Sequence, residues 1–325
     1  MEKLTIFGTI GPACANKEML TEMFKAGMNG VRLNLSHVNL SDCSEWLNLL
    51  KEASHAANTT CDILIDMKGP ELRIGKLAQP LSLIEGETIT LGKDIPVPTL
   101  VFEYLEKGQE ILLDDGKYLL EVIDQGLCKV VHGGLLTSSK SMALVNKQVA
   151  MPTLTDSDIE NLKVAKANGI TGIMQPFVRN AQDLKTIKET LHALDADDLK
   201  VYAKIENLEG VQHLPELLPY CDAIVIARGD LGNAMDLSEL PFVQKQIQDI
   251  CKEHNKPYMV VTQMLNSMIS APVPTRAEVS DIFYAVYHGA SAIMLTGETA
   301  AGKYPLEAMQ MFCRCAKSAL RAIEK

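Results

Sequence analysis

Several features that would assign a function class at once are missing from this chain of 325 residues. No apolar run approaches the ~20 residues that a membrane-spanning helix needs. The first residues, Met-Glu-Lys-Leu-Thr-Ile-Phe-Gly, contain neither an apolar signal segment nor a cleavage site. The net charge of −10 opposes bulk nucleic-acid binding. We therefore expect neither a membrane nor a nucleic acid as partner, although local cations could still bind a phosphorylated substrate.

Cysteine motifs are missing as well. None of the eight cysteines forms a Cys-x-x-Cys pair, and only Cys313 and Cys315 lie close together in sequence. Scattered cysteines in a chain of this size are typical of buried thiols in a reducing compartment. The sequence therefore predicts a cytoplasmic protein, and it gives no sign of a structural zinc site.

The common motifs of nucleotide-binding and hydrolytic enzymes are also absent. There is no P-loop, no Gly-x-Ser-x-Gly and no pairing of histidine with cysteine for a covalent nucleophile. His37, His132 and His288 have no obvious partner, and of these His37 alone lies in a polar segment. The chemistry must therefore come from other residues.

A lysine and a glutamate leave one short apolar strand together, at residues 201–206. Because side chains alternate along a strand, Lys204 and Glu206 point to the same side. Burying both charges is costly unless they pair with each other or serve chemistry. An isolated pair of this kind is most often a plain ion pair. Here, however, other strands along the chain end in a similar way.

Apolar strand patterns alternate with helical patterns along most of the chain. We expect strands at residues 4–9, 31–35, 62–66, 171–175, 201–205, 223–227, 258–262 and 292–295. A helix capped by Ser41 or Asp42 should follow the second of them. Runs such as Ala-Ile-Val-Ile-Ala are typical of parallel strands covered on both faces. Eight such units predict an α/β fold, a closed (β/α)8 TIM barrel, with a doubly wound open sheet as the alternative.

Residues 75–150 interrupt this alternation. Short apolar runs are separated there by the turn signals Glu-Gly-Glu, Asp-Asp-Gly and His-Gly-Gly, which predicts a small inserted β-barrel domain. We therefore assign residues 1–74 and 151–325 to the barrel and 75–150 to the insertion, with hinges near Gly75 and Pro152. The loops after barrel strands lie on the catalytic face, so the insertion is expected to act as a lid.

Polar side chains gather where the second strand ends. Arg32, Asn34 and Ser36 share one face of it, while two leucines take the other. Arg32 suits a phosphate, and Asn34 and Ser36 offer oxygens to a hard cation. The plain alternative is a helix cap beside a surface arginine.

Other strands end with comparable groups. Asp66 closes the third strand as a ligand or counter-charge, and Arg73 follows it as a second phosphate-binding candidate. After the sixth strand, two glycines flank Asp230, so backbone N–H groups could approach an anion while the carboxylate holds a metal. A glycine-flanked turn without a ligand is the alternative. Thr262 adds a hydroxyl after the seventh strand.

Glu206 and Asp230 are the two carboxylates that look like ligands of a divalent metal. Two carboxylates with spare coordination suit magnesium, which keeps waters and substrate oxygens. Lysine and arginine beside them suit a phosphoryl group in transfer.

With these segments in hand, the chain resembles the pyruvate kinase family over nearly its whole length. The resemblance rests on Thr-Ile-Gly-Pro at 9–12, Arg-Leu-Asn-Leu-Ser-His at 32–37, Lys-Gly-Pro-Glu-Leu-Arg at 68–73, Asp-Asp-Gly at 114–116, Lys-Ile-Glu-Asn at 204–207, Ala-Arg-Gly-Asp-Leu-Gly at 227–232, Thr-Gln-Met-Leu at 262–265, Pro-Thr-Arg-Ala-Glu at 274–278, Met-Leu-Thr-Gly-Glu-Thr-Ala at 294–300 and Tyr-Pro at 304–305. It implies a barrel with a mobile β domain and transfer of phosphate from phosphoenolpyruvate to ADP, which gives pyruvate and ATP in the last step of glycolysis. It also implies Mg²⁺, usually K⁺, and an oligomer of identical subunits formed through the barrel.

The resemblance also implies roles for single residues. The catalytic residues would be Lys204, Arg32 and Thr262, with Lys204 on the moving phosphoryl group. The substrate would be bound by Arg32, Lys204, Gly229, Asp230 and Thr262. Mg²⁺ would be held by Glu206 and Asp230, and K⁺ by Asn34, Ser36, Asp66 and the carbonyl of Met67. The nucleotide would be bound by Asn34, His37, Arg73 and Lys140.

The chain departs from the family pattern in several places. Met67 stands where threonine is usual, and Pro176 where serine is usual. The stretch from Lys140 reads Lys-Ser-Met-Ala, where the family favours Lys-Gly-Val-Asn. The chain ends where the family usually begins a C-terminal domain, and we expect that domain to be absent. After Lys-Gly-Pro, glutamate accompanies potassium dependence and lysine accompanies independence, so Glu71 predicts activation by K⁺.

Two other functions stay open. One is a catalytically weak relative that binds phosphoenolpyruvate and has a sensing or scaffolding role, suggested by the altered segment around Lys140. The other is a magnesium-dependent aldolase or mutase that handles pyruvate enolates on a similar barrel. Arg73 and Lys140 argue against the second, because an aldolase has no nucleotide to bind.

Overall fold

The computed structural model describes residues 4–36, 38–70, 72–114, 116–147, 149 and 151–324. His37 and Glu71, which the sequence singles out, lie outside the described residues.

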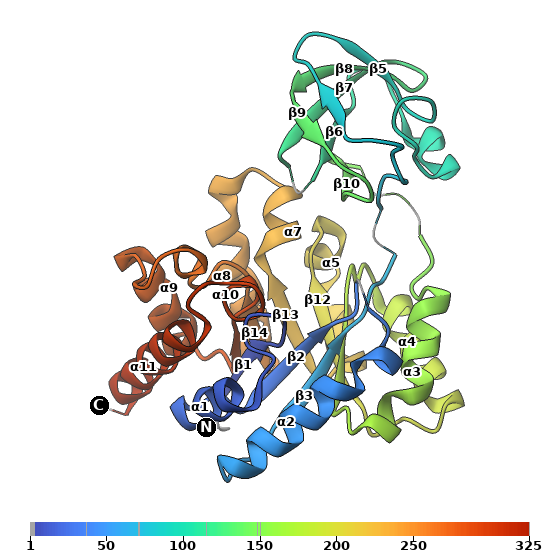
Figure 1. Cartoon of the computed structure of the whole chain (residues 1–325). Helices are drawn as coiled ribbons and strands as arrows, with labels where there is room; N and C mark the ends of the chain where they lie inside the picture. The colour runs from blue at the N-terminus through green and yellow to red at the C-terminus, as the bar shows by residue number, and fades with distance from the viewer. Residues whose placement is uncertain are drawn as a thin grey trace. The chain divides into compact units, whose positions relative to one another are not determined.

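Within that part of the chain, eight parallel strands close into a barrel in the order β1-β15-β14-β13-β12-β11-β3-β2 (Figure 1). The strands are β1 (Thr5–Thr9), β2 (Gly30–Asn34), β3 (Asp62–Asp66), β11 (Gly172–Gln175), β12 (Lys200–Ile205), β13 (Ala223–Ala227), β14 (Tyr258–Val261) and β15 (Ala292–Met294). The first strand pairs with both β2 and β15, which completes the ring. The predicted (β/α)8 barrel is confirmed, and the open-sheet alternative is wrong.

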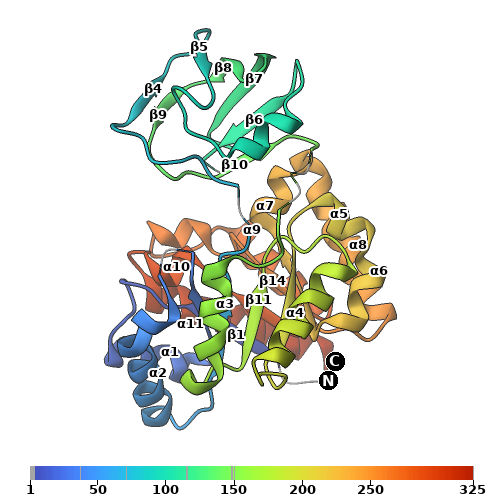
Figure 2. The ribbon, with the colours of Figure 1, turned by 90° about the vertical axis from the view of Figure 1, so that its right-hand side faces the viewer.

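Most helices lie on the outside of this barrel (Figures 1 and 2). The longer ones are α1 (Lys17–Ala26), α2 (Ser44–Ala56), α3 (Asp156–Ala165), α4 (Ala181–Ala193), α8 (Leu240–Glu253), α9 (Arg276–Tyr287) and α11 (Pro305–Ile323). The shorter ones are α5 (Leu208–Gln212), α6 (Leu214–Leu217), α7 (Arg228–Asn233) and α10 (Gly297–Ala300). Single 3₁₀ turns are η1 (Leu40–Cys43), η2 (Thr99–Tyr104), η3 (Lys166–Asn168), η4 (Leu218–Tyr220), η5 (Leu237–Glu239) and η6 (Asn266–Ile269).

Local side chains decide where several helices begin. Asn16 accepts a hydrogen bond from the N–H of Met19, and Thr155 and Thr275 form capping boxes at the starts of α3 and α9. The cap expected at Ser41 or Asp42 is wrong, because both residues lie inside η1. A distant group holds that turn instead, since Asn161 accepts the N–H of Leu40 at 2.8 Å.

The barrel interior is filled by apolar side chains from alternate positions of the strands. The cluster consists of Phe7, Leu64, Met174, Val225, Ala227, Met259, Val261, Ala292 and Met294. Tyr202 of β12 packs against it. Lys204 and Glu206 have the same parity along the chain as Tyr202, so they face the same interior, nearer the carboxyl ends of the strands.

The chain divides into two compact units, residues 1–69, 153–228 and 240–325 in the first, and residues 70–152 and 229–239 in the second. The second unit contains antiparallel sheets of order β10-β6-β7-β8-β5 and β4-β9. Their strands are β4 (Leu81–Leu83), β5 (Thr88–Thr90), β6 (Glu110–Leu113), β7 (Tyr118–Asp124), β8 (Leu127–His132), β9 (Gly134–Leu136) and β10 (Met142–Leu144). The predicted division into a barrel domain at residues 1–74 and 151–325 and an inserted domain at residues 75–150 stays a prediction.

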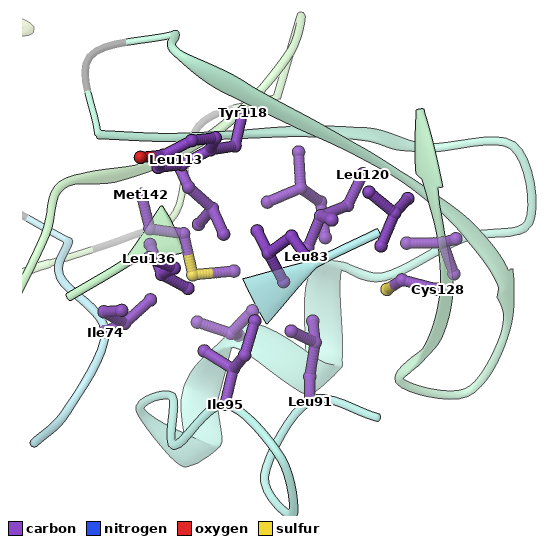
Figure 3. Close-up of a cluster of buried hydrophobic side chains, with 14 of the residues drawn as sticks. Ile74, Leu83, Leu91, Ile95, Leu113, Tyr118, Leu120, Cys128, Leu136 and Met142 are labelled. Atoms are coloured by element: carbon purple, nitrogen blue, oxygen red, sulfur yellow. The ribbon is translucent and has the colours of Figure 1, made fainter. Parts of the chain in front are cut away.

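An apolar core holds the second unit together (Figure 3). Leu83, Leu113, Leu120 and Leu136 from different strands point into it, and each is at most 3% exposed. The apolar runs expected from the sequence do not include β9 and β10, and length alone does not explain this, because β4 and β5 are equally short.

One carboxylate of the barrel binds the chain on either side of residues 70–152. Asp158 of α3 is completely buried. It accepts the N–H of Lys68 at 2.9 Å and the N–H of Gly69 at 3.2 Å, just before the chain leaves the first unit. It also accepts the N–H and the hydroxyl of Thr155, at 2.9 and 2.6 Å, just after the chain returns. Two segments separated by some eighty residues are thus fixed to one side chain.

The cysteines are free thiols, all of them buried except Cys61, which is half-buried. Burial raises the pKa of Cys14 to about 11, so this thiol is inert near neutral pH. No helix among the described residues is both long and apolar enough to cross a membrane.

Candidate active site

Four charged side chains meet at the carboxyl ends of β2, β3 and β12, and we call them the charged cluster: Arg32, Asp66, Lys204 and Glu206. Arg32 donates from Nε to Asp66 Oδ2 at 2.9 Å. The Lys204 ammonium lies 3.2 Å from Asp66 Oδ1 and 3.0 Å from Glu206 Oε1. Their side chains are between 2% and 14% exposed. Charges this far out of water interact strongly with one another and with any ligand beside them.

Strand register explains how the cluster forms. Met174 of β11 is paired with Asp66 of β3 on one side and with Tyr202 of β12 on the other. Lys204 stands two residues further along β12, and its long side chain reaches across β11 to the Asp66 carboxylate. The sequence predicted that Lys204 and Glu206 share a side, and the 3.0 Å contact between them confirms this.

Asp66 is the counter-charge of both cations. Burial alone would raise the pKa of this carboxyl, but the Lys204 ammonium and the Arg32 guanidinium outweigh it, so the pKa of Asp66 is lowered. The ionised carboxylate therefore holds both cations in place.

Two neighbours of the cluster escaped the sequence interpretation. Thr9 of β1 is buried, donates its hydroxyl to the carbonyl of Leu295 at 2.9 Å and accepts from Arg32 at 3.4 Å. The N–H of Phe177 donates to Glu206 Oε2 at 2.8 Å. Thr9 lies two residues after Phe7, which faces the barrel interior, so the alternation along β1 could have indicated that Thr9 faces the interior as well. Nothing in the sequence announces that the backbone of Phe177 adopts a φ of +53°.

Oxygen atoms lie next to the charged cluster. Asn34 is the register partner of Asp66, and Asn34 Oδ1 accepts the N–H of Ser36 at 3.2 Å. As predicted, Leu33 and Leu35 are buried on the opposite face. Met67 follows Asp66, and its side chain is buried.

The remaining candidates lie elsewhere. Thr262 directly follows β14. Gly229 and Asp230 lie in the first turn of α7. Both belong to the second unit.

Arg73 and Lys140 lie near each other within the second unit. Arg73 donates to the carbonyl of Ser139 at 2.8 Å, and the Lys140 ammonium lies 2.8 Å from Asp114. The hydrogen bond from Lys140 is the largest of the contacts that lower the pKa of Asp114.

A family model described as "Pyruvate kinase, barrel domain" matches residues 1–309. The chain belongs to the pyruvate kinase family.

Individual pyruvate kinases match closely. The protein of Chlamydia pneumoniae is 37% identical over 321 residues, which cover 94% of this chain and 66% of the relative. The protein of Geobacillus stearothermophilus is 36% identical over 339 residues, 99% of this chain and 58% of the relative. Plastidial pyruvate kinase 3 of Arabidopsis thaliana is 37% identical over 323 residues, 95% of this chain and 56% of the relative. The chain thus spans between about half and two thirds of the length of these pyruvate kinases.

One departure from the pyruvate kinase pattern has a visible packing partner. Gly69 has a φ of +60°, and a Cβ on it would come within 2.3 Å of the ring of Pro176. Pro176 thus packs against the turn that follows Met67 and Lys68, and the next residue, Phe177, reaches Glu206. A proline at this position stiffens the loop that presents an N–H to the charged cluster.

Pyruvate kinases use metal ions. Among the described residues, no three His, Cys, Asp or Glu side chains gather as a metal-binding group. The donor chemistry nevertheless fits the family. Asn34, the register partner of Asp66, supplies an amide oxygen, and Glu206 supplies a carboxylate at the end of the barrel.

Proposed function

We propose that this chain transfers a phosphoryl group from phosphoenolpyruvate to ADP. In this reaction the P–O bond to the enol oxygen breaks, a terminal phosphate oxygen of ADP takes the phosphoryl group, and the remaining enolate is protonated to pyruvate. The observation that carries the proposal is the charged cluster, in which two mostly buried cations are held side by side by one ionised carboxylate. Membership of the family supports the same conclusion.

Arg32 and Lys204 would act on the transferred group. Phosphoryl transfer leaves little covalent chemistry to the protein, so its residues contribute by positioning and by stabilising charge. Lys204 is oriented by Asp66 and Glu206 before substrate arrives, so little reorganisation is needed as negative charge moves. Thr262 and the N–H groups of the first turn of α7, at Gly229 and Asp230, would hold the substrate carboxylate.

Glu206 and Asp230 would hold Mg²⁺. When bound, the ion neutralises phosphate oxygens. Calorimetry can follow this without turnover: Glu206→Gln should weaken Mg²⁺ binding about tenfold or more, since an amide is a weaker ligand for this ion than a carboxylate. Unchanged binding would remove Glu206 from the metal site.

A second site would take K⁺ through Asn34, Ser36, Asp66 and the carbonyl of Met67. The Asn34 amide and the Asp66 carboxylate, on paired residues of β2 and β3, support it. We expect activation by K⁺ over Na⁺ or Li⁺. Glu71→Lys should reduce the dependence, because a tethered ammonium replaces the ion. Full activity of the unmodified protein in potassium-free buffer would contradict this proposal.

The nucleotide would be bound by Asn34, His37, Arg73 and Lys140, with the inserted β domain as a lid over the site. The proximity of Arg73 and Lys140 within the second unit supports a shared anion-binding role. We also propose that the protein is located in the cytoplasm.

Subunits would associate through the barrel. Helix α9 exposes Tyr284 by 55% and Tyr287 by 48%, and the ring of Phe283 stacks on Tyr287 with centroids 5.7 Å apart. Exposed aromatic groups of this kind are enriched at protein interfaces. Light scattering tests this, since Tyr287→Lys should lower the mass of any oligomer.

The deciding experiment measures pyruvate formation from phosphoenolpyruvate with each of several nucleoside diphosphates. Turnover that requires a nucleoside diphosphate supports the proposal. Binding of phosphoenolpyruvate without turnover would favour the weak, sensing relative. Turnover of pyruvate enolates without a nucleotide would favour the aldolase or mutase.

A further inference from the structure

Two consecutive residues after β14 have left-handed backbones. Thr262 has a φ of +79° and Gln263 a φ of +56°. Side chains disfavour this region, and a β-branched residue disfavours it most, so such a backbone persists only where surrounding contacts enforce it. Strain of this kind concentrates at functional sites.

The left-handed turn changes where Thr262 can point. Val261 packs in the barrel interior. In a regular strand the next side chain would point the opposite way, toward the helices. A positive φ at Thr262 departs from the strand backbone, so its side chain need not follow this alternation. The strained conformation therefore has a use in a site that needs this hydroxyl.

One guanidinium enforces the conformation. Arg228 donates from Nη2 and Nε to the carbonyl of Thr262, at 2.6 and 3.2 Å. Its Nη1 donates to both oxygens of Asp281 on α9, at 2.9 and 2.7 Å. The Arg228 side chain is 13% exposed. A planar fork with donors on both edges can hold the two partners at once, whereas a lysine ammonium cannot keep this geometry.

Arg228 is well placed to join two strand ends. It directly follows Ala227, the register partner of Val261, and Thr262 directly follows Val261. The contact therefore bridges neighbouring strands β13 and β14 at the same height. Gly229 and Asp230 follow Arg228 in the chain.

We propose that Arg228, oriented by Asp281, is a positioning residue that holds Thr262 in its left-handed conformation and so places its hydroxyl for the substrate. The effect on turnover rests on the proposed function, whereas the effect on the backbone does not. The competing explanation is an ion pair between Arg228 and Asp281 that only supports the packing of α9.

A double-mutant cycle separates these explanations. Arg228→Lys should lower kcat/KM for phosphoenolpyruvate about 10- to 100-fold, and so should Thr262→Val. If Arg228 acts through the hydroxyl, the double variant should lie within about threefold of Thr262→Val alone, because coupled residues are not additive. Losses that multiply independently would overturn the proposal, and so would full activity of Arg228→Lys.

The chain offers a matched control. After β11, Arg179 makes an equally short ion pair with Asp183, with Nη2 and Oδ1 2.7 Å apart. Arg179→Lys should show no coupling to Thr262→Val. Coupling of equal size would reveal a general loss of packing and would contradict a specific role for Arg228.

A second measurement works without turnover. Hydrogen exchange of the peptide covering residues 258–265 should speed up at least tenfold in Arg228→Lys and stay unchanged in Arg179→Lys. Should Arg228→Lys fail to fold, Asp281→Asn keeps the size of the group, loosens the guanidinium and takes its place in both experiments. An unchanged exchange rate in Arg228→Lys would overturn the proposal that Arg228 holds the Thr262 backbone. If Arg228→Lys exchanges faster but the unmodified protein does not turn over phosphoenolpyruvate, Arg228 still positions the Thr262 backbone and the proposed function is wrong.

Discussion

The carboxyl end of the barrel and the core of the second unit bury different kinds of side chain. At the carboxyl end of the barrel, Asp66 and Glu206 lie buried beside two cations. The core of the second unit consists of aliphatic side chains with Tyr118 and Cys128 among them. Buried ion pairs contribute little net stability, because desolvation offsets their attraction, whereas buried aliphatic groups stabilise directly. This difference fits the proposal that the charged cluster serves chemistry, while the core of the second unit stabilises its fold.

The largest expected effect is on the chemical side of this comparison. Lys204→Met should lower turnover by about 10²–10³, since a fixed cation at the site of developing charge is lost. A coupled assay measures the rate and circular dichroism the fold. Lys200→Met, an exposed lysine on the same strand, is the control and should stay near normal. Near-normal turnover of Lys204→Met would show that the charged cluster does not serve the reaction.

The stability side is tested in the second unit. Leu120→Ala should lower the free energy of unfolding of that unit by about 2–5 kcal/mol, because the fully buried side chain leaves a cavity. Denaturant unfolding followed by a probe in this unit measures the loss. Ile123→Ala on the same strand is the control; its side chain is 37% exposed, and the expected change is below about 1 kcal/mol. Equal losses would mean that the core does not hold the unit.

Acid should affect the barrel through Asp66. Its folded-state pKa lies below the unfolded value, so its stabilising contribution is present above about pH 4 and is lost as the pH falls through the folded-state pKa. Unfolding midpoints between pH 3 and 7 should drop at the acid end. Asp66→Asn should be less stable at pH 7 and should lose less on acidification. An unchanged acid limb in Asp66→Asn would assign the drop to other groups.

The smallest effect concerns a helix start. Thr275→Ala removes the capping box of α9 and should cost about 1 kcal/mol, whereas Thr275→Ser should cost little. Thermal unfolding measures both. The loss should leave turnover unchanged, because the cap touches neither the charged cluster nor Arg228.

The features that could be predicted from the sequence are those that depend on the local alternation of apolar and polar residues. The apolar strands and the shared parity of Lys204 and Glu206 depend on a period of two, which the sequence displays directly. The contacts of Asp66 with Arg32 and Lys204 required the strand order, which a list of strands does not contain. Conformations such as those of Phe177 and Thr262 were invisible, since neither residue type favours a positive φ.

Asp158 illustrates the same limit from another side. Its sequence context, Thr-Asp-Ser-Asp, is compatible with a capping box, and the structure forms one. Its second task, binding the N–H groups of Lys68 and Gly69, joins residues 90 positions apart. No periodic pattern carries that information.

The Asp158 contact also bears on how this barrel could acquire an insertion. Closing a flexible loop costs an entropy that grows only slowly with its length, provided that its ends are held together. Here the ends are held by one side chain of the barrel, at Lys68 and Gly69 on one side and Thr155 on the other. For the barrel, closing residues 70–152 therefore costs only a little more entropy than closing a short connection. We therefore expect that residues 70–152 can be exchanged or redesigned with little change in the barrel's free energy of unfolding.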